Sequence, residues 1–187
     1  MYDFLTTSPW PDYELIDSGN FQKLERFGKY LLARPEPQAI WDPHLPLKEW
    51  ERADAAFARA PGSTEKGQWR LKPDMPEQWL IDYQRPDGLK LKFRLGLSSF
   101  KHVGLFPEQD PNWQFIYNQT RRRRAQLPRV LNLFAYTGAA TLAARAAGAG
   151  QRAFFLPYYA RTASPLPLRP AYVRLPHHLP LARLRAD

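Results

Sequence analysis

The pattern of apolar and polar positions predicts a chain that opens with short strands. Short runs typical of strands lie over 13–16, 22–27 and 29–34, and turn-forming residues at 17–20 and at Gly28 separate these segments. This pattern predicts a small antiparallel meander. Further strands are predicted from Trp69 onward, over 79–83 and over 88–96, where Leu and Phe alternate with Lys and Arg.

Helix-forming composition marks two other segments. Residues 50–60 include five alanines and precede Pro61-Gly62, so we expect a helix that stops there. A second helix is expected over 113–124, after a loop at 98–109.

A strand, a tight loop and a helix follow one another near residue 140. Residues 129–134 are a short apolar run typical of a buried parallel strand, 135–138 form the loop, and 139–147 are strongly helix-forming before Gly148. This order is the first half of a nucleotide-type βαβ unit. The turn holds one glycine and lacks the G-x-G-x-x-G fingerprint, which favours a nucleoside-type ligand over a pyrophosphate. The alternative from the pattern alone is the first strand and helix of any α/β protein.

Composition and charge narrow the class of protein. Of 187 residues, 44% are apolar, enough for a core, and the formal net charge is +9 from 27 basic and 18 acidic residues. The absence of cysteine, of a membrane-length apolar stretch and of a signal peptide favours a cytoplasmic protein without disulfides or membrane contact. His102 has no second ligand at metal spacing, so we expect no metal site.

The last 37 residues differ from the rest. Residues 151–187 hold 6 arginines against one acid, Asp187, and 6 prolines without glycine, lysine or glutamate. An extended segment is the local expectation. Its origin is either a genuine basic tail or translation out of frame.

Three segments carry a resemblance to a known family. VLNLFAYTGAATLAARAAGA (130–149) resembles motif I of class I S-adenosylmethionine-dependent methyltransferases, above all the branch that modifies bases of large-subunit ribosomal RNA. FKHVGLFPEQ (100–109) is similar to that branch's cofactor-side loop, and residues 12–41 resemble an amino-terminal β-rich segment of one bacterial subgroup. The resemblance implies an α/β chain with a β-rich domain (1–87), the beginning of a Rossmann-like methyltransferase domain (88–150) that is incomplete, and a non-family tail (151–187).

The resemblance also implies a cofactor, a partner and site residues. S-adenosyl-L-methionine would be bound at its methionine and sulfonium end by Phe134, Tyr136, Thr137 and Gly138, and Lys101, His102 and Gln109 would close over it. The partner would be ribosomal RNA. Phosphate contact is one reading of Arg121, Arg122, Arg123 and Arg124; a solvated helix end is the other.

The chain departs from the family after motif I. An acidic residue that binds the cofactor ribose is expected near residue 158, about 20 positions past the glycine, yet none stands between Asp110 and Asp187, and no D-P-P motif occurs. We therefore expect a reading-frame shift near residue 150, a truncated enzyme without methyltransferase activity, and no assignable catalytic residue. The competing hypothesis is a non-catalytic, basic RNA-binding module. A dinucleotide-dependent oxidoreductase is disfavoured by the single-glycine loop. Oligomeric state stays open.

Overall fold

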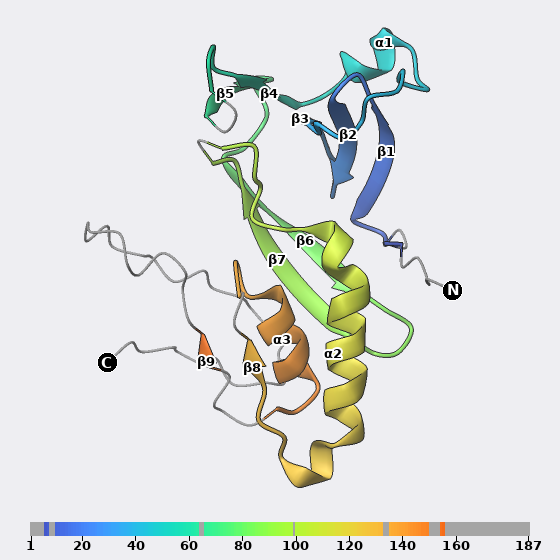
Figure 1. Cartoon of the computed structure of the whole chain (residues 1–187), viewed down its shortest axis with the longest axis vertical. Coiled ribbons are helices and arrows are strands. Elements are labelled where there is room, and N and C mark those ends of the chain that lie inside the picture. The colour runs from blue at the N-terminus through green and yellow to red at the C-terminus, as the bar shows by residue number, and fades with distance from the viewer. Residues whose placement is uncertain are drawn as a thin grey trace, which may run out of the picture. The chain divides into compact units, whose positions relative to one another are not determined.

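The computed structural model describes residues 6–7, 10–63, 66–98, 100–132 and 135–149, and the backbone of 154–155 (Figure 1). The contacts divide the chain into two compact units that are discontinuous in sequence. Unit 1 comprises Met1–Ser8, Tyr83–Lys92 and Leu105–Asp187, and unit 2 comprises Pro9–Asp82 and Phe93–Gly104. The domain boundaries predicted at residues 87 and 150 remain a prediction.

Unit 2 is built on a five-stranded sheet with strand order β1-β2-β3-β4-β5. All neighbouring strands are antiparallel except β3 and β4, which are parallel. The strands are β1 (Tyr13–Gly19), β2 (Gln22–Phe27), β3 (Tyr30–Pro35), β4 (Ala55–Arg59) and β5 (Gly67–Leu71). The meander predicted from the sequence is confirmed in its three strands.

The turn between β1 and β2 lies later than predicted. Asn20 and Phe21 both have positive φ, 48° and 62°, as the two central residues of a type I′ hairpin turn do. Asp17 stays in β1, where a register shift between Leu15 and Asp17 interrupts the pairing with β2. The turn-forming residues at 17–20 therefore mark the end of the strand and only part of the turn.

The helix predicted over 50–60 is wrong. Helix α1 is a single turn (Leu47–Trp50), and Ala55–Arg59 form strand β4 instead. Ala55 lies opposite Leu32 of β3 and opposite Leu71 of β5, with a fully buried side chain. Pairing on both edges outweighs the helix propensity of the alanines, because propensity contributes only tenths of a kcal/mol per residue (about 0.7 at most for ordinary residues).

Strands β6 (Gln78–Gln84) and β7 (Lys90–Gly96) pair as a two-stranded sheet, and the division between the units falls within both strands. Buried and exposed positions alternate along each, as the sequence predicts. The turn after β6 is closed by hydrogen bonds from Arg85 N to Leu89 O and from Gly88 N to Arg85 O.

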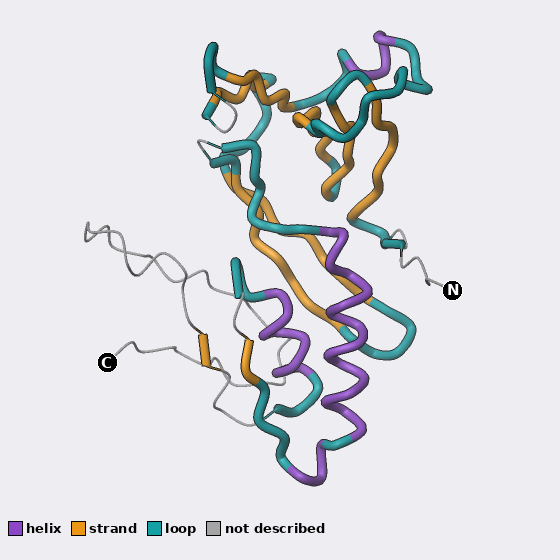
Figure 2. The backbone as a smooth tube through the Cα atoms, viewed as in Figure 1, coloured by secondary structure: helices purple, strands orange, loops and turns teal. Residues whose placement is uncertain are grey.

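Unit 1 contains both described α-helices that are longer than a single turn (Figure 2). Its elements are η1 (Pro107–Gln109), α2 (Asp110–Arg122), η2 (Arg124–Gln126), β8 (Leu131–Asn132), α3 (Ala139–Ala146) and β9 (Phe154–Phe155). Helix α2 begins at Asp110, three residues before the predicted start at residue 113. Pro111 lies in its first turn, where a missing N–H costs no helical bond. Helices α2 and α3 pack against each other.

The predicted strand, loop and helix form the first half of a βαβ unit. The strand is shorter than the predicted 129–134, since β8 covers only Leu131–Asn132 of the described residues, and it is not buried as predicted, with Leu131 61% exposed. Leu131 and Asn132 of β8 pair in parallel with Phe154 and Phe155 of β9, and α3 lies between them in the chain. Gly148 ends α3 as predicted, with φ 96° and hydrogen bonds from Gly148 N to Arg145 O and from Ala149 N to Ala144 O, the pattern of a Schellman cap. Within the described residues, no helix is both long and apolar enough to cross a bilayer.

Candidate functional site

The loop between β8 and α3 is a tight turn that leads directly into the helix. Gly138 N donates to Ala135 O at 2.7 Å, and Leu142 N donates to Gly138 O at 2.9 Å as the first bond of α3. Asn132 Nδ2 donates to Thr141 Oγ1 at 3.0 Å and so joins the end of β8 to the first turn of the helix. Strand, loop and helix N-terminus are thereby held as one element.

Two residues of this loop have left-handed backbone conformations. Gly138 has φ 97°, which glycine adopts without strain, and Tyr136 has φ 47°, which a side chain with a Cβ rarely adopts. Strained non-glycine backbone of this kind concentrates at ligand sites. The loop is therefore a candidate site on its geometry as well as on its sequence.

The Tyr136 ring of this loop contacts the ring of Phe106. The Phe106 ring, from the segment before η1, lies 4.4 Å from the Tyr136 ring between centroids, at 36°. The Tyr136 side chain is 46% exposed. Its partly open π-face suits a positively charged group such as a sulfonium, which the electron-rich face of an aromatic ring attracts.

Gly138 precedes the first turn of α3. It is buried, and a Cβ built on this residue would meet no described atom within 4 Å. The α3 N-terminus has no side-chain cap, and the first N–H groups of a helix point outward without intrahelical acceptors, which favours a carboxylate or another anion there. These features fit the amino-acid end of S-adenosylmethionine, with its carboxylate at the helix and its sulfonium near the ring.

The other predicted site residues of unit 1 are distributed along the same segments. Thr137 is exposed in the loop, and Gln109 is exposed in η1, where its Oε1 accepts a hydrogen bond from Asn112 Nδ2 at 2.8 Å. Phe134 lies outside the described residues, as do 156–187, which include the position near 158 where a ribose-binding acid is expected. The sequence singled out Tyr136 and Gly138 but did not single out Phe106, although it lies within the resembling segment 100–109.

Lys101 and His102 belong to unit 2. Arg34 Nη1 donates to Lys101 O at 3.2 Å, and Lys101 Nζ donates to Pro35 O at 3.4 Å. Ser98 Oγ donates to His102 O at 2.9 Å. The segment that carries both predicted residues is thus fastened to the five-stranded sheet of unit 2.

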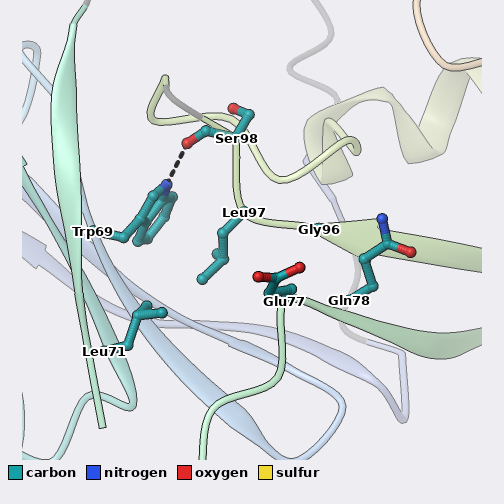
Figure 3. Close-up of a pocket in the computed structure, with 7 residues that line it drawn as sticks. All are labelled: Trp69, Leu71, Glu77, Gln78, Gly96, Leu97 and Ser98. Atoms are coloured by element: carbon teal, nitrogen blue, oxygen red, sulfur yellow. Dashed lines mark hydrogen bonds between the residues drawn. The ribbon is translucent and has the colours of Figure 1, made fainter. Parts of the chain in front are cut away.

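A shallow groove lies where this segment leaves β7 (Figure 3). Trp69 Nε1 donates to Ser98 O at 2.7 Å across one side of it. The groove has a volume of about 440 Å³ and is lined by Trp69, Leu71, Glu77, Gln78, Gly96, Leu97 and Ser98. None of the residues predicted to bind cofactor or RNA lines it.

The four consecutive arginines are exposed, but three of them make contacts within unit 1. Arg121 donates to Asp87 O at 2.7 Å, and Arg123 donates to Gln119 O at 3.2 Å. The Arg124 side chain packs over Gly148, where a Cβ would lie 3.0 Å from Arg124 Cγ. These contacts fit a helix end as well as a phosphate site, so the role in RNA binding stays a prediction.

A buried ionic network that the sequence did not indicate stands at the start of α2. Asp110 is fully buried and accepts hydrogen bonds from Tyr83 Oη at 2.5 Å, from Arg85 Nε at 3.0 Å and Nη2, and from Gln114 Nε2 at 2.9 Å. Burial opposes the charged guanidinium, but the bonds and charge of Asp110 outweigh it and raise the pKa of Arg85. Burial, followed by the contact with Asp110, raises the pKa of Tyr83. The network fixes η1 and the start of α2, which follow Phe106 in the chain.

In the part of the chain that the structure describes, no group of three or more His, Asp or Glu side chains could hold a metal ion.

Comparisons with known proteins bear on the site. No protein-family profile matches the chain, and no curated protein sequence does. A solved structure from Agrobacterium tumefaciens, described as a SAM-dependent methyltransferase, matches 78% of this chain with 41% identity and a TM-score of 0.66. This chain is similar to a methyltransferase.

The match covers 44% of the Agrobacterium chain, so the present sequence spans less than half of that protein's length. A Streptococcus mutans protein assigned to the same class matches 74% of this chain and 37% of its own at 17% identity and a TM-score of 0.47. The mixed α/β fold and the likeness to a SAM-dependent methyltransferase agree with the expectation from motif I.

Proposed function

We propose that the loop at 135–138 binds S-adenosyl-L-methionine, and that the chain carries the cofactor-binding start of a methyltransferase that acts on a base of large-subunit ribosomal RNA. The observation that carries the proposal is the uncapped N-terminus of α3 after the left-handed turn at Gly138, beside the exposed side chain of Tyr136. The likeness to the Agrobacterium SAM-dependent methyltransferase supports the cofactor. The motif resemblance supports the RNA substrate.

The cofactor supplies a methyl group activated by the sulfonium. The residues of this chain would bind and orient it: the α3 N–H groups its carboxylate, and the Tyr136 ring its sulfonium. For the ribose hydroxyls the chain offers no acidic side chain between Asp110 and Asp187, and Asp110 itself is buried in its ionic network. We therefore propose cofactor binding without methyl transfer by these 187 residues.

Isothermal titration of the full chain with S-adenosylmethionine tests the site through Gly138→Ala. The matched control is Gly62→Ala in unit 2, because Gly62 also has a positive φ (74°, against 97° for Gly138) and also has no described atom within 4 Å of a built Cβ. Both changes carry a backbone strain of about 1 kcal/mol. We expect a loss of cofactor affinity of about tenfold or more, roughly 1.4 kcal/mol, for Gly138→Ala alone.

Two results would contradict the proposal. One is wild-type protein that does not bind S-adenosylmethionine, and the other is equal affinity in the two alanine variants. Transfer of a labelled methyl group to ribosomal RNA by the purified chain would contradict only the expected lack of turnover.

A further inference from the structure

Four basic side chains gather at one end of the five-stranded sheet in unit 2. Lys23 in β2 and Arg34 in β3 are cross-strand partners. Arg59 ends β4, and because β3 and β4 run parallel, their carboxyl ends lie at the same end of the sheet. Lys101 Nζ reaches Pro35 O, at the last residue of β3. We call Lys23, Arg34, Arg59 and Lys101 the basic end.

The carboxylates near the basic end do not balance it. Glu25 is fully buried, and its Oε2 accepts hydrogen bonds from Arg34 Nε at 2.8 Å and Nη2 at 2.5 Å. Glu36 lies 3.5 Å from Lys23 and has a side chain that is 32% exposed. Lys23 also lies 3.7 Å from Glu25, so it is close to both carboxylates. Four cations thus face two carboxylates, which leaves an excess of two positive charges at the basic end.

The excess of positive charge acts on Lys101. Burial lowers the pKa of its ammonium, and the charges of Arg59, Lys23 and Arg34 lower it further, whereas Glu36 opposes them. An anion bound among these cations reduces their mutual repulsion. The arrangement of the cations therefore favours the binding of an anion. Arg34 acts as a positioning residue, since its Nη1 binds the carbonyl of Lys101.

Exposed aromatic rings flank the basic end. Phe100, next to Lys101 in the chain, is 39% exposed and forms an isolated backbone bridge with Lys66, the residue before β5. Phe21 is 54% exposed, and its carbonyl accepts a hydrogen bond from Glu36 N at 2.7 Å. Cations that follow a phosphate backbone beside aromatic faces that stack on bases are the general means of binding single-stranded nucleic acid.

We propose that the basic end of unit 2 binds single-stranded RNA, with Lys23, Arg59 and Lys101 on backbone phosphates and Phe100 stacked on a base. The choice of RNA among polyanions rests on the function proposed above, and the surface itself rests on the charges and rings just described. The proposed RNA contact therefore lies in unit 2, whereas the arginines at the end of α2 belong to unit 1.

Fluorescence anisotropy with a labelled single-stranded RNA of about 12 nucleotides and the full chain tests the proposal between roughly 50 and 200 mM salt. Lys23→Gln, Arg59→Gln and Lys101→Gln should each weaken binding about three- to tenfold and reduce the salt slope by about 0.7, the value for one lost phosphate contact on a single strand. Lys29→Gln removes the same charge at the opposite end of the β2–β3 hairpin, where Lys29 is exposed. It should change affinity less than about twofold.

Charge-conserving variants separate lost contacts from lost structure. Arg59→Lys and Lys101→Arg should stay within about twofold of wild type. The proposal is overturned if wild type does not bind the RNA, if Lys29→Gln weakens binding as much as the other glutamine variants, or if the charge-conserving variants lose as much. Equal competition by inorganic polyphosphate, with no effect of Phe100→Ala, would also overturn it in favour of a general anion site.

Titration with S-adenosylmethionine on the same preparations keeps the two proposals apart. Lys23→Gln and Arg59→Gln should retain wild-type cofactor affinity, and Gly138→Ala should retain wild-type RNA affinity. RNA binding without cofactor binding would refute the proposed function and leave the basic end supported. Cofactor binding with RNA affinity insensitive to Lys23, Arg59 and Lys101 would do the reverse.

Discussion

Each unit contains a fully buried carboxylate held by an arginine fork and a tyrosine hydroxyl. In unit 1, Asp110 accepts from Arg85 and Tyr83. In unit 2, Glu25 accepts from Arg34 and from Tyr13 Oη at 3.1 Å. The guanidiniums also lie at similar distances from an aromatic ring, 5.6 Å for Arg85 over Tyr83 and 5.5 Å for Arg34 over Phe27.

The two networks differ in what surrounds them. Asp110 also accepts a hydrogen bond from the neutral amide of Gln114, so the charge of the carboxylate is matched by one guanidinium. Around Glu25, Lys23 lies 3.7 Å away and also contacts Glu36, and Arg34 extends to the backbone of Lys101. The first network is a closed structural link, whereas the second is continuous with a cationic surface. The same residue types thus support the fold in one unit and, by our inference, a binding site in the other.

The strongest test of the structural role is Asp110→Ala. It leaves the Arg85 guanidinium buried without its carboxylate, and breaking a buried pair in this way costs about 3–5 kcal/mol. Urea unfolding followed by circular dichroism measures the loss, and hydrogen exchange should assign it to the peptides of unit 1.

The control for this variant is Glu108→Ala, which removes an exposed carboxylate two residues earlier, in η1. It should cost less than about 0.5 kcal/mol. If Asp110→Ala were no more destabilising than Glu108→Ala, the network would not hold this unit together.

A matched pair of amide variants sharpens the comparison. Glu25→Gln and Asp110→Asn each remove one buried negative charge with little change of shape, and each should cost about 1.5–3 kcal/mol, the range for hydrogen bonds to a charged group. Only Glu25→Gln should also tighten RNA binding, by about two- to fivefold, because it increases the excess charge at the basic end.

Anisotropy and urea unfolding on the two purified proteins measure both quantities. Tighter RNA binding by Asp110→Asn, or no tightening by Glu25→Gln, would show that the two networks do not differ in the way that their surroundings indicate.

The elements that the sequence predicts correctly are those in which local pattern and tertiary pairing agree. Strands β6 and β7 alternate strictly and bury alternate residues. The segment 55–59 fails because its alanines favour a helix locally, while pairing with β3 and β5 decides the outcome. Local pattern carries no information about such long-range pairing.

Prediction of the candidate site divides in the same way. The loop with Gly138 and the helix after it could be read from the sequence, since both signals are local. Glu25 and Asp110 could not, because an isolated acid in a sequence is normally solvated and becomes buried only when a distant arginine meets it. The cationic surface joins segments near residues 23, 34, 59 and 101, and only the fold brings these together.

The smallest effect expected to distinguish the two units is the pH dependence of RNA affinity. Lys101 has a pKa below the ordinary 10.5, so its ammonium loses its proton earlier than that of an unperturbed lysine as the pH rises. RNA affinity of the wild type should therefore fall as the pH rises through that lowered pKa. Lys101→Arg should keep its affinity in the same window, since a guanidinium remains charged.

The neighbouring groups do not account for such a difference. The other charged groups around Lys101, which are Lys23, Glu25, Arg34, Glu36 and Arg59, are the same in both proteins, so their contributions cancel in the comparison. In unit 1, the pKa values of Arg85 and Tyr83 are both raised, so neither titrates there and the stability of that network should not change. An alkali-stable 2′-O-methyl RNA allows anisotropy to be measured from pH 7 to about 10. Superimposable profiles for wild type and Lys101→Arg would mean that the Lys101 ammonium does not contact the RNA, and the phosphate contacts would then have to be sought among Lys23, Arg59 and the arginines of α2.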